Sequence, residues 1–237
     1  MRTSALVLFA ALSLGPSARI ASAQGDAARP SAFQLARTER FLANRLACRG
    51  CHQIGGRGGA IGPALDGIRE RSEFDRVLSM ITDPSGTVPG TLMPRQRMPE
   101  REARRLAAYI MTLPALPDRT VVGVPEAAVI PPPADELDGA SLYARHCASC
   151  HGAEGRGDGW NAPNLPVPPT NHTDGEAMSK RPDDTLYDGI AAGAFVLDRS
   201  PLMPAFADQL SPAQIRALVA HIRVLCACEQ PAWARGG

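Results

Sequence analysis

The sequence has few aromatic residues and almost no lysine. Aromatic side chains make up 5% of its 237 residues, and Lys180 is the only lysine. Domains of about 100 residues have difficulty in building a dry core from small side chains alone. The scarcity of aromatic residues therefore favours a fold that packs around some other large apolar body.

Long apolar runs are also missing. No stretch of about 18 apolar residues occurs, so the sequence predicts no membrane-spanning helix. The chain begins with Met1-Arg2, a short apolar run over Ala5–Leu14 and then Ala21-Ser22-Ala23, which together predict a signal peptide over residues 1–23. No cysteine precedes Cys48, so none near the predicted cleavage site could carry a lipid. We expect an exported, periplasmic protein that is soluble after cleavage and has no transmembrane anchor.

Charge is nearly balanced, with a formal net charge of +1, but it is distributed unevenly. Residues 24–118 carry 14 arginines against 10 acidic residues, a net charge of +4. Residues 119–237 carry 9 basic against 14 acidic residues, a net charge of −5. Neither half has the concentrated basic stripe that nucleic-acid binding needs, so we expect no nucleic-acid partner.

Two copies of one five-residue motif are present: Cys48-Arg49-Gly50-Cys51-His52 and Cys147-Ala148-Ser149-Cys150-His151. Cys-x-x-Cys-His is the attachment signature for c-type haem. Residues three apart on a helical turn are neighbours, so both sulfurs can reach the two vinyl groups along one edge of a porphyrin. The histidine that follows is then held under the iron as its proximal ligand. The doubled motif predicts two covalently bound haems c.

Three other interpretations of the motif are possible. Cys-x-x-Cys can be half of a zinc site, but zinc sites of this kind more often lack the fixed trailing histidine. A thioredoxin-like redox pair would lie in a βαβ pattern, which the sequence does not show. Four cysteines can also form a disulfide framework in an exported protein. Haem is preferred because the motif is doubled and because each copy has matching residues downstream.

The helix pattern repeats in the two halves. Helices are expected over residues 31–47, 74–81 and 99–113, and again over 135–149, 183–192 and 211–225. A segment rich in Pro and Val, residues 119–134, is expected to be a semi-rigid linker. The predicted organisation is a signal peptide over 1–23, a first domain over 24–118, this linker, a second domain over 135–228 and a tail over 229–237.

Apolar residues of the first helix and two loop segments support this plan. Phe33, Leu35, Phe41, Leu42 and Leu46 are expected to form the buried face of the helix over 31–47. Two loop segments of the first half have counterparts in the second: Gly62-Pro63-Ala64-Leu65 matches Ala162-Pro163-Asn164-Leu165, and Leu92-Met93-Pro94 matches Leu202-Met203-Pro204. The chain is therefore interpreted as a tandem duplication of one haem domain.

On these motifs each half resembles a class I cytochrome c domain, and the whole is similar to exported dihaem cytochromes c. The second half, with Gly152 after its motif and Met203-Pro204-Ala205-Phe206 further on, most resembles the haem domains of oxidase-associated cytochromes. The likeness covers about residues 31–225. It implies an all-α fold of two tandem domains, each a small helical bundle around one covalent haem with its first and last helices crossing.

The resemblance also implies a methionine from a loop as the sixth iron ligand, whose soft thioether sulfur favours Fe(II). Met93 and Met203 fit, because each precedes a proline that keeps its segment extended. Met98 also precedes a proline, but it is interpreted as an apolar anchor at a helix start. Met178 has no counterpart in the first half and is a weaker rival.

By the same resemblance, the carbonyl groups of Pro63 and Pro163 accept a hydrogen bond from the proximal histidine Nδ1 and so fix its ring. For Pro163 an ordinary loop proline remains an equal alternative. His172 is the only serious alternative sixth ligand, whereas His146 and His221 are expected to be structural. The family pattern offers no role for Cys226 and Cys228, which are open to interpretation as buried small residues, a bridge or an intermolecular link.

The function expected from all this is that of an exported dihaem cytochrome that transfers electrons between redox partners. The alternatives are a dihaem dehydrogenase that oxidises a small inorganic or organic donor, and a haem subunit of a membrane respiratory complex. An electron carrier is preferred to an enzyme, since the sequence shows no nucleophile with a base and no paired carboxylates in a shared motif. The opposed net charges would favour approach of the domains and would let Arg95, Arg97 and Arg101 attract an acidic partner. The alternative is that these charges are scattered, solvent-facing residues.

Overall fold

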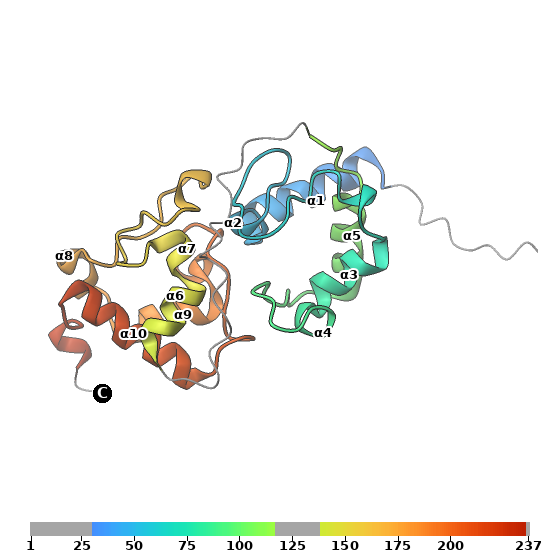
Figure 1. Cartoon of the computed structure of the whole chain (residues 1–237). Helices are drawn as coiled ribbons and strands as arrows, with labels where there is room; N and C mark the ends of the chain where they lie inside the picture. The colour runs from blue at the N-terminus through green and yellow to red at the C-terminus, as the bar shows by residue number, and fades with distance from the viewer. Residues whose placement is uncertain (1–29, 117–137, 236–237) are drawn as a thin grey trace, which may run out of the picture.

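The computed structural model describes residues 30–116 and 138–235, which form two helical lobes (Figure 1). The first lobe contains α1 (Ala32–Arg45), α2 (Cys48–Cys51), η1 (Ile68–Glu70), α3 (Phe74–Thr82), α4 (Pro84–Thr87) and α5 (Glu100–Ile110). The second contains α6 (Gly139–His146), α7 (Ala148–His151), η3 (Ala162–Asn164), α8 (Gly175–Ser179), α9 (Asp183–Ala192), η4 (Ala194–Leu197), α10 (Pro212–Cys226) and η5 (Ala232–Ala234).

The described part of the chain has no β-strand beyond one isolated bridge between Ile54 and Arg57. This confirms the all-α fold class. The predicted signal peptide over 1–23 and the predicted linker over 119–134 lie outside the described residues. No described helix is long and apolar enough to cross a membrane.

The helices α1 and α10 begin at the same local signal. Ser31 precedes α1 and Ser211 precedes α10, and each serine side chain accepts a hydrogen bond from the backbone N–H of a glutamine three residues on. The side chains of these glutamines, Gln34 and Gln214, accept a hydrogen bond from the serine N–H in return, which completes a capping box. Pro212 at the first position of α10 has no N–H to leave unpaired.

In the first lobe α5 packs against α1 and α3. Leu42 of α1, Val77 and Ile81 of α3, and Leu106 and Ile110 of α5 are buried together. These side chains recur at helical spacing along each helix, which is why one face of each is buried. The lobe therefore has a small aliphatic core of its own.

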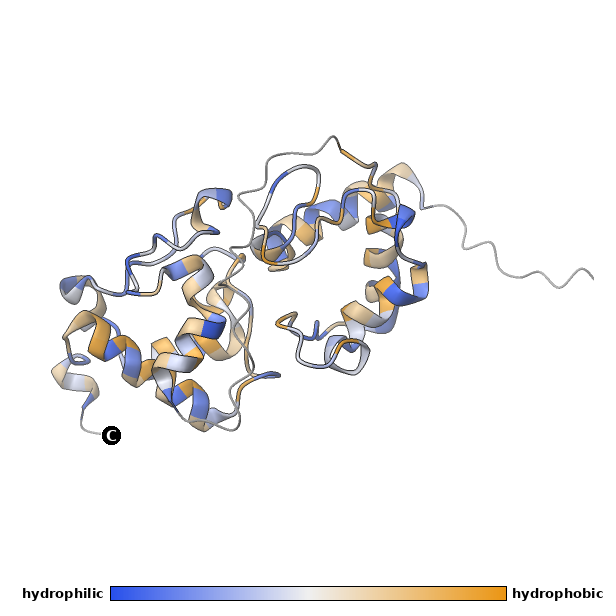
Figure 2. Ribbon diagram, in the orientation of Figure 1, coloured by the Kyte–Doolittle hydropathy of each residue, from blue (hydrophilic) through white to orange (hydrophobic). Residues whose placement is uncertain are grey.

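The second lobe is built in the same way, with α10 packed against α6 and α9. Its core includes Leu142 and Tyr143 of α6, Ile190 of α9, and Leu218 and Ile222 of α10. Figure 2 shows hydrophobic residues along α3, α5 and α10. In both lobes the helix before the cysteine motif packs against the last helix, as the resemblance implied.

The predicted buried face of α1 was too wide. Leu42 is fully buried and Leu35 and Leu46 pack against the core, but Phe33 is 70% exposed and Phe41 is 37% exposed. At about 100° per residue, Phe33 lies on the opposite side of the helix from Leu42, and Phe41 lies a quarter turn away. Five apolar residues at these positions cannot share one face.

The remaining predictions on helices hold with shifts at the ends. The helix expected over 183–192 is α9 with the same bounds, and those expected over 74–81, 99–113 and 211–225 are α3, α5 and α10. Each of the helices expected over 31–47 and 135–149 is two helices in the structure. A long helix comes first, α1 or α6, and a separate single turn at the cysteine motif follows, α2 or α7. The short helix α8 was not expected.

Candidate haem-attachment sites

Each cysteine motif forms one helical turn at the end of the preceding helix. In the first, the backbone N–H of His52 donates to the carbonyl of Cys48 at 2.8 Å. In the second, the N–H of His151 donates to the carbonyl of Cys147 at 2.9 Å. This i→i+4 bonding keeps the two cysteines of a motif on one side of a turn, and all four are free thiols.

Burial keeps these thiols protonated at neutral pH. It raises the pKa of Cys48 to about 11 and the pKa values of Cys51 and Cys147 to about 12. Burial also raises the pKa of Cys150, opposed by a hydrogen bond from Asn161. The two sulfurs on one side of each turn are the groups that would form thioether bonds to a porphyrin.

In the first site the His52 ring is fixed by a carbonyl and by lack of space. Its Nδ1 lies 2.7 Å from the carbonyl oxygen of Pro63, the hydrogen bond expected from the resemblance. A Cβ at Gly62 would lie 2.3 Å from the ring carbon Cε1. Burial lowers the pKa of His52. A neutral ring that donates from Nδ1 has its lone pair on Nε2, where an iron would bind.

In the second site a different residue supplies the carbonyl. His151 Nδ1 lies 2.9 Å from the carbonyl oxygen of Thr170, not from that of Pro163, so the hydrogen bond expected for Pro163 is wrong. The acceptor in the first site is eleven residues after its histidine and the acceptor in the second is nineteen residues after. The second loop is longer, and Pro163 lies within the short turn η3 instead.

His172 lies directly against the ligand histidine of the second motif. The rings of His151 and His172 stack with centroids 4.3 Å apart and an interplanar angle of 13°. His172 Nδ1 is 2.9 Å from the hydroxyl of Tyr143, and burial lowers the pKa of His172 to about 3. A sixth ligand would have to lie across the porphyrin from His151, so a ring stacked on His151 itself does not suit that role.

The other two histidines lie on the helices where structural roles were expected. His146 on α6 packs its ring edge-on against Phe206, and burial lowers its pKa to about 4. His221 on α10 lies with its ring 5.1 Å from that of Tyr143 on α6. His221 therefore lies between the first and last helices of its lobe.

The candidate methionines differ in their burial. Met93 and Met203 are half-buried in irregular loop segments. Met98 packs against the core of the first lobe, and Met178 is fully buried in the core of the second. Met203 also packs against the core of the second lobe, so the assignment of Met93 and Met203 as ligands continues to rest on the sequence pattern.

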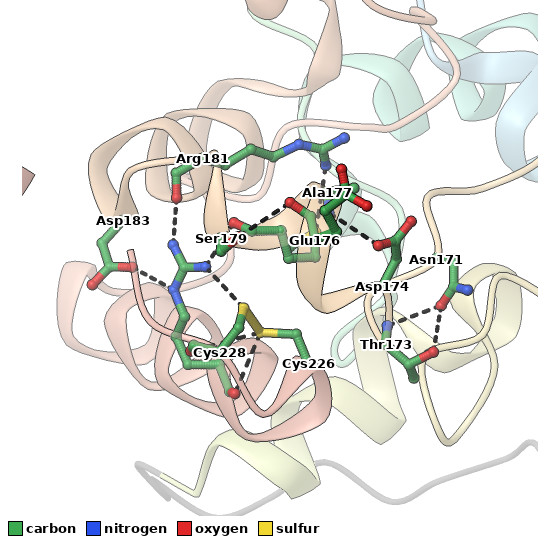
Figure 3. The surroundings of a disulfide bond; sticks show 12 residues. Asn171, Thr173, Asp174, Glu176, Ala177, Ser179, Arg181, Asp183, Cys226 and Cys228 are labelled. Atoms are coloured by element: carbon green, nitrogen blue, oxygen red, sulfur yellow. Dashed lines mark hydrogen bonds and ion pairs between the residues drawn. A yellow bond between two sulfur atoms is a disulfide. The ribbon is translucent and has the colours of Figure 1, made fainter. Parts of the chain in front are cut away.

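The last two cysteines form a disulfide, with Cys226 and Cys228 joined at a Cα–Cα distance of 5.1 Å. Figure 3 shows the bridge beside Arg181 and Asp183, at the start of α9. Arg223 Nε donates to Asp183 at 2.8 Å and Nη1 lies 3.6 Å from Cys228 Sγ. Of the three interpretations left open by the sequence, the structure shows the intramolecular bridge, which closes a local ring at the end of α10, while Arg223 bonds that end to Asp183.

The two lobes are in contact through several side chains. Arg97 pairs with Asp208 through Nε, at 2.9 Å from Oδ2. Arg145 Nη2 donates to the carbonyl of Gly90 at 3.2 Å, and the guanidinium of Arg45 lies 5.0 Å from the ring centre of Phe195. The basic first lobe and the acidic second lobe thus form an ion pair, between Arg97 and Asp208. Arg97, expected to attract an external acidic partner, pairs within the chain instead.

Within the described ranges, no three or more His, Cys, Asp or Glu side chains gather in a way that could hold a metal ion. The donor set that is present is a pair of thiols with one neutral imidazole, found twice. That set fits a porphyrin iron, for which the protein supplies one axial nitrogen and two thioether attachments. The motif and its local geometry define c-type cytochrome domains.

Comparison with known families gives the same class. Residues 40–114 match the cytochrome c family model, and residues 134–222 match the model for subunit III of cbb3-type cytochrome c oxidase. The chain belongs to the class I cytochrome c family, as two tandem domains. Such domains bind haem c covalently and serve haem-based electron transfer.

Two curated relatives are both described as the FixP subunit of a cbb3-type cytochrome c oxidase. The one from Azorhizobium caulinodans is 29% identical over 206 residues, which cover 83% of this chain and 62% of the relative. The one from Bradyrhizobium sp. is 28% identical over 136 residues, which cover 57% of this chain and 37% of the relative. The chain thus spans less than two thirds of the length of either.

A solved structure described as the KustC0563 c-type cytochrome is 26% identical, with a TM-score of 0.29. The match covers 37% of this chain and 96% of that structure's chain.

Proposed function

We propose that the chain is an exported dihaem c-type cytochrome that transfers electrons between redox partners. The observation that carries the proposal is the repeated local geometry: a helical turn with two free thiols three residues apart, followed by a histidine whose Nδ1 is at a backbone carbonyl. The two domains would span residues 24–118 and 135–228, joined by the linker over 119–134 and followed by a tail over 229–237. Export to the periplasm would follow removal of residues 1–23.

Each domain would hold its haem with its own residues. Cys48 and Cys51 would attach the first by thioethers, and Cys147 and Cys150 the second. A bound haem supplies an iron that cycles between Fe(III) and Fe(II), one electron at a time. His52 and Met93 would be the axial ligands in the first domain, and His151 and Met203 those in the second.

The surrounding residues would set ligand orientation and basicity. The carbonyl of Pro63 holds the plane of the His52 ring, and the carbonyl of Thr170 does so for His151. A histidine that donates from Nδ1 is a more basic ligand at Nε2. A methionine sulfur on the opposite side would raise the potential, which suits a carrier that accepts electrons from a donor and passes them on.

A second candidate is a haem-bearing subunit of a membrane respiratory complex. The match of residues 134–222 to an oxidase subunit model and the names of the two relatives favour it. In that role the two haems would pass electrons to a membrane-bound partner. Both candidates need the same two haem sites, and only the partner differs.

Absorption and magnetic spectroscopy during a redox titration tests the proposal. Two six-coordinate, low-spin haems, each taking up one electron, are expected for a carrier or a subunit. A high-spin haem with an open coordination position would contradict this function and indicate a dehydrogenase. Co-purification of the untagged chain with a membrane oxidase would separate the subunit from the free carrier.

A further inference from the structure

The two cysteine turns lie against one another, and Asn161 is the residue between them. It follows the glycine-rich loop of the second motif, and its side chain is completely buried. Its backbone N–H donates to the carbonyl of Ser149, inside the second motif, at 2.8 Å. Asn161 is therefore fixed to the turn of its own domain.

The side chain of Asn161 bonds the turn of the other domain. Its Nδ2 donates to the carbonyl of Gly50, inside the first motif, at 2.9 Å. Its Oδ1 accepts from the N–H of Ala60 at 2.9 Å, and Nδ2 also lies 3.3 Å from Cys150 Sγ. Breaking the hydrogen bonds of this buried amide is costly, because each donor or acceptor that loses its partner stays buried and unpaired.

Glycine in the first motif lets the turns come this close. A Cβ at Gly50 would lie 2.1 Å from the carbonyl oxygen of Leu202, the residue before Met203. Backbone on that side cannot move aside cheaply, so any side chain at Gly50 would push the lobes apart. The second motif has Ser149 at the matching position, which shows that the motif itself does not demand glycine there.

The second cysteines of the two motifs are neighbours across this contact. Asn161 Nδ2 lies against Cys150 Sγ and against the carbonyl of Gly50, the residue before Cys51. The attachment edges of two haems bound at these cysteines would therefore face one another.

We propose that Asn161 and Gly50 hold the two attachment turns edge to edge, and that electrons pass between the two haems across this contact. The proposal rests on the proposed function. In such a transfer one iron would go from Fe(II) to Fe(III) as the other went from Fe(III) to Fe(II), with no bond made or broken. Asn161 is a positioning residue, since it sets the separation of the two attachment edges.

The test uses the full chain with both haems attached, in the variants Asn161→Ala and Gly50→Ala. The control is Asn44→Ala, which changes an exposed asparagine of α1. Two quantities are measured: hydrogen exchange of the Ala60 amide, and the rate of electron exchange between haems after flash reduction of one of them. Gly50→Ala reaches the contact from the other domain and keeps Asn161 intact, so it serves if Asn161→Ala does not fold.

Asn161→Ala is expected to speed exchange of the Ala60 amide about tenfold, the factor that loss of one buried hydrogen bond puts on a local opening equilibrium. Both variants are expected to slow electron exchange between the haems by a similar factor, with each haem's absorption spectrum unchanged. The control should match the unaltered protein in both quantities.

Three results would overturn the inference. These are an unchanged inter-haem rate in both variants, faster exchange of the Ala60 amide with an unchanged inter-haem rate, or equal slowing in Asn44→Ala. Failure of the proposed function is a different result, because the unaltered chain would then carry fewer than two covalent haems or take up fewer than two electrons.

Discussion

The ring of His172 lies flat on the ring of His151, and its Nδ1 is bonded to the hydroxyl of Tyr143. Tyr143 comes from α6, the helix that leads into the second motif, and is 1% exposed. The stack therefore connects the candidate axial ligand to the packed core of its domain. Among the described residues, no ring stacks on His52 in this way, so the support belongs to the second domain.

Replacing His172 with Leu is expected to loosen the His151 ring and to shift the potential of the second haem only. The matched control is His146→Leu, which removes another buried histidine of the same domain that packs on Phe206 instead. Potentiometric titration of both haems measures the effect. Equal shifts in the two variants would show that the stack has no particular influence on His151.

The hydrogen bond below the stack can be tested separately with Tyr143→Phe. This change leaves the buried Nδ1 of His172 without its partner, at an expected cost of about 1–3 kcal/mol in the free energy of unfolding. Denaturant titration of the holoprotein, followed by circular dichroism, measures that cost. A variant as stable as the unaltered protein would show that the bond contributes nothing net.

The candidate sixth ligands make a prediction for each domain. Met93→Ala and Met203→Ala should each abolish the methionine-to-iron charge-transfer band of one haem and lower that haem's potential, because a soft sulfur ligand that favours Fe(II) is lost. Met98→Leu should leave both bands intact, since Met98 packs against the first core. The assignment in the first domain is wrong if Met98→Leu removes a band that Met93→Ala retains.

Gly62 should tolerate no side chain. A Cβ there would meet the His52 ring at 2.3 Å, so Gly62→Ala is expected to displace the ring and to weaken iron ligation in the first haem alone. Ala162 matches Gly62 in sequence but lies in η3, eight residues before the carbonyl that His151 uses, so Ala162→Gly is a control that should leave both haems unchanged. Low-temperature magnetic spectroscopy, which separates low-spin from high-spin iron, reads out both variants.

The ion pair between Arg97 and Asp208 should make the arrangement of the lobes depend on salt. The Arg97 side chain is 76% exposed, so ions screen this pair effectively once the Debye length falls to about 8 Å near physiological ionic strength. Small-angle X-ray scattering should show the unaltered chain expanding as salt rises, and Arg97→Gln should be less sensitive. Identical scattering from both proteins at every salt concentration would contradict a role for the pair.

Features fixed by short-range sequence were predictable. Ser31 and Ser211 each begin a helix because their side chains bond a backbone N–H three residues away, and the cysteine turns follow from spacing alone. The error at Phe33 arose from pooling apolar residues that cannot share one helical face. Helix propensity and apolar spacing predict that a helix forms. They predict which of its sides is buried only when the angle between each pair of residues around the helix axis is taken into account.

Features that depend on loop paths or on the second domain were not predictable. The carbonyl at His151 comes from Thr170 because the intervening loop is longer than in the first domain, and only Pro168-Pro169 before it indicated an extended segment. Asn161 had no local signal at all, since its partners Gly50 and Ala60 are about a hundred residues away. Such contacts exist only once both domains are folded and docked.

Mass spectrometry of the denatured chain, matured in a host that attaches c-type haem, tests the central claim most directly. The account predicts two covalent haems, one on the peptide with Cys48 and Cys51 and one on the peptide with Cys147 and Cys150. Replacing Cys48 and Cys51 with Ala should leave a single haem on the second peptide. One haem or none on the unaltered chain would contradict the account.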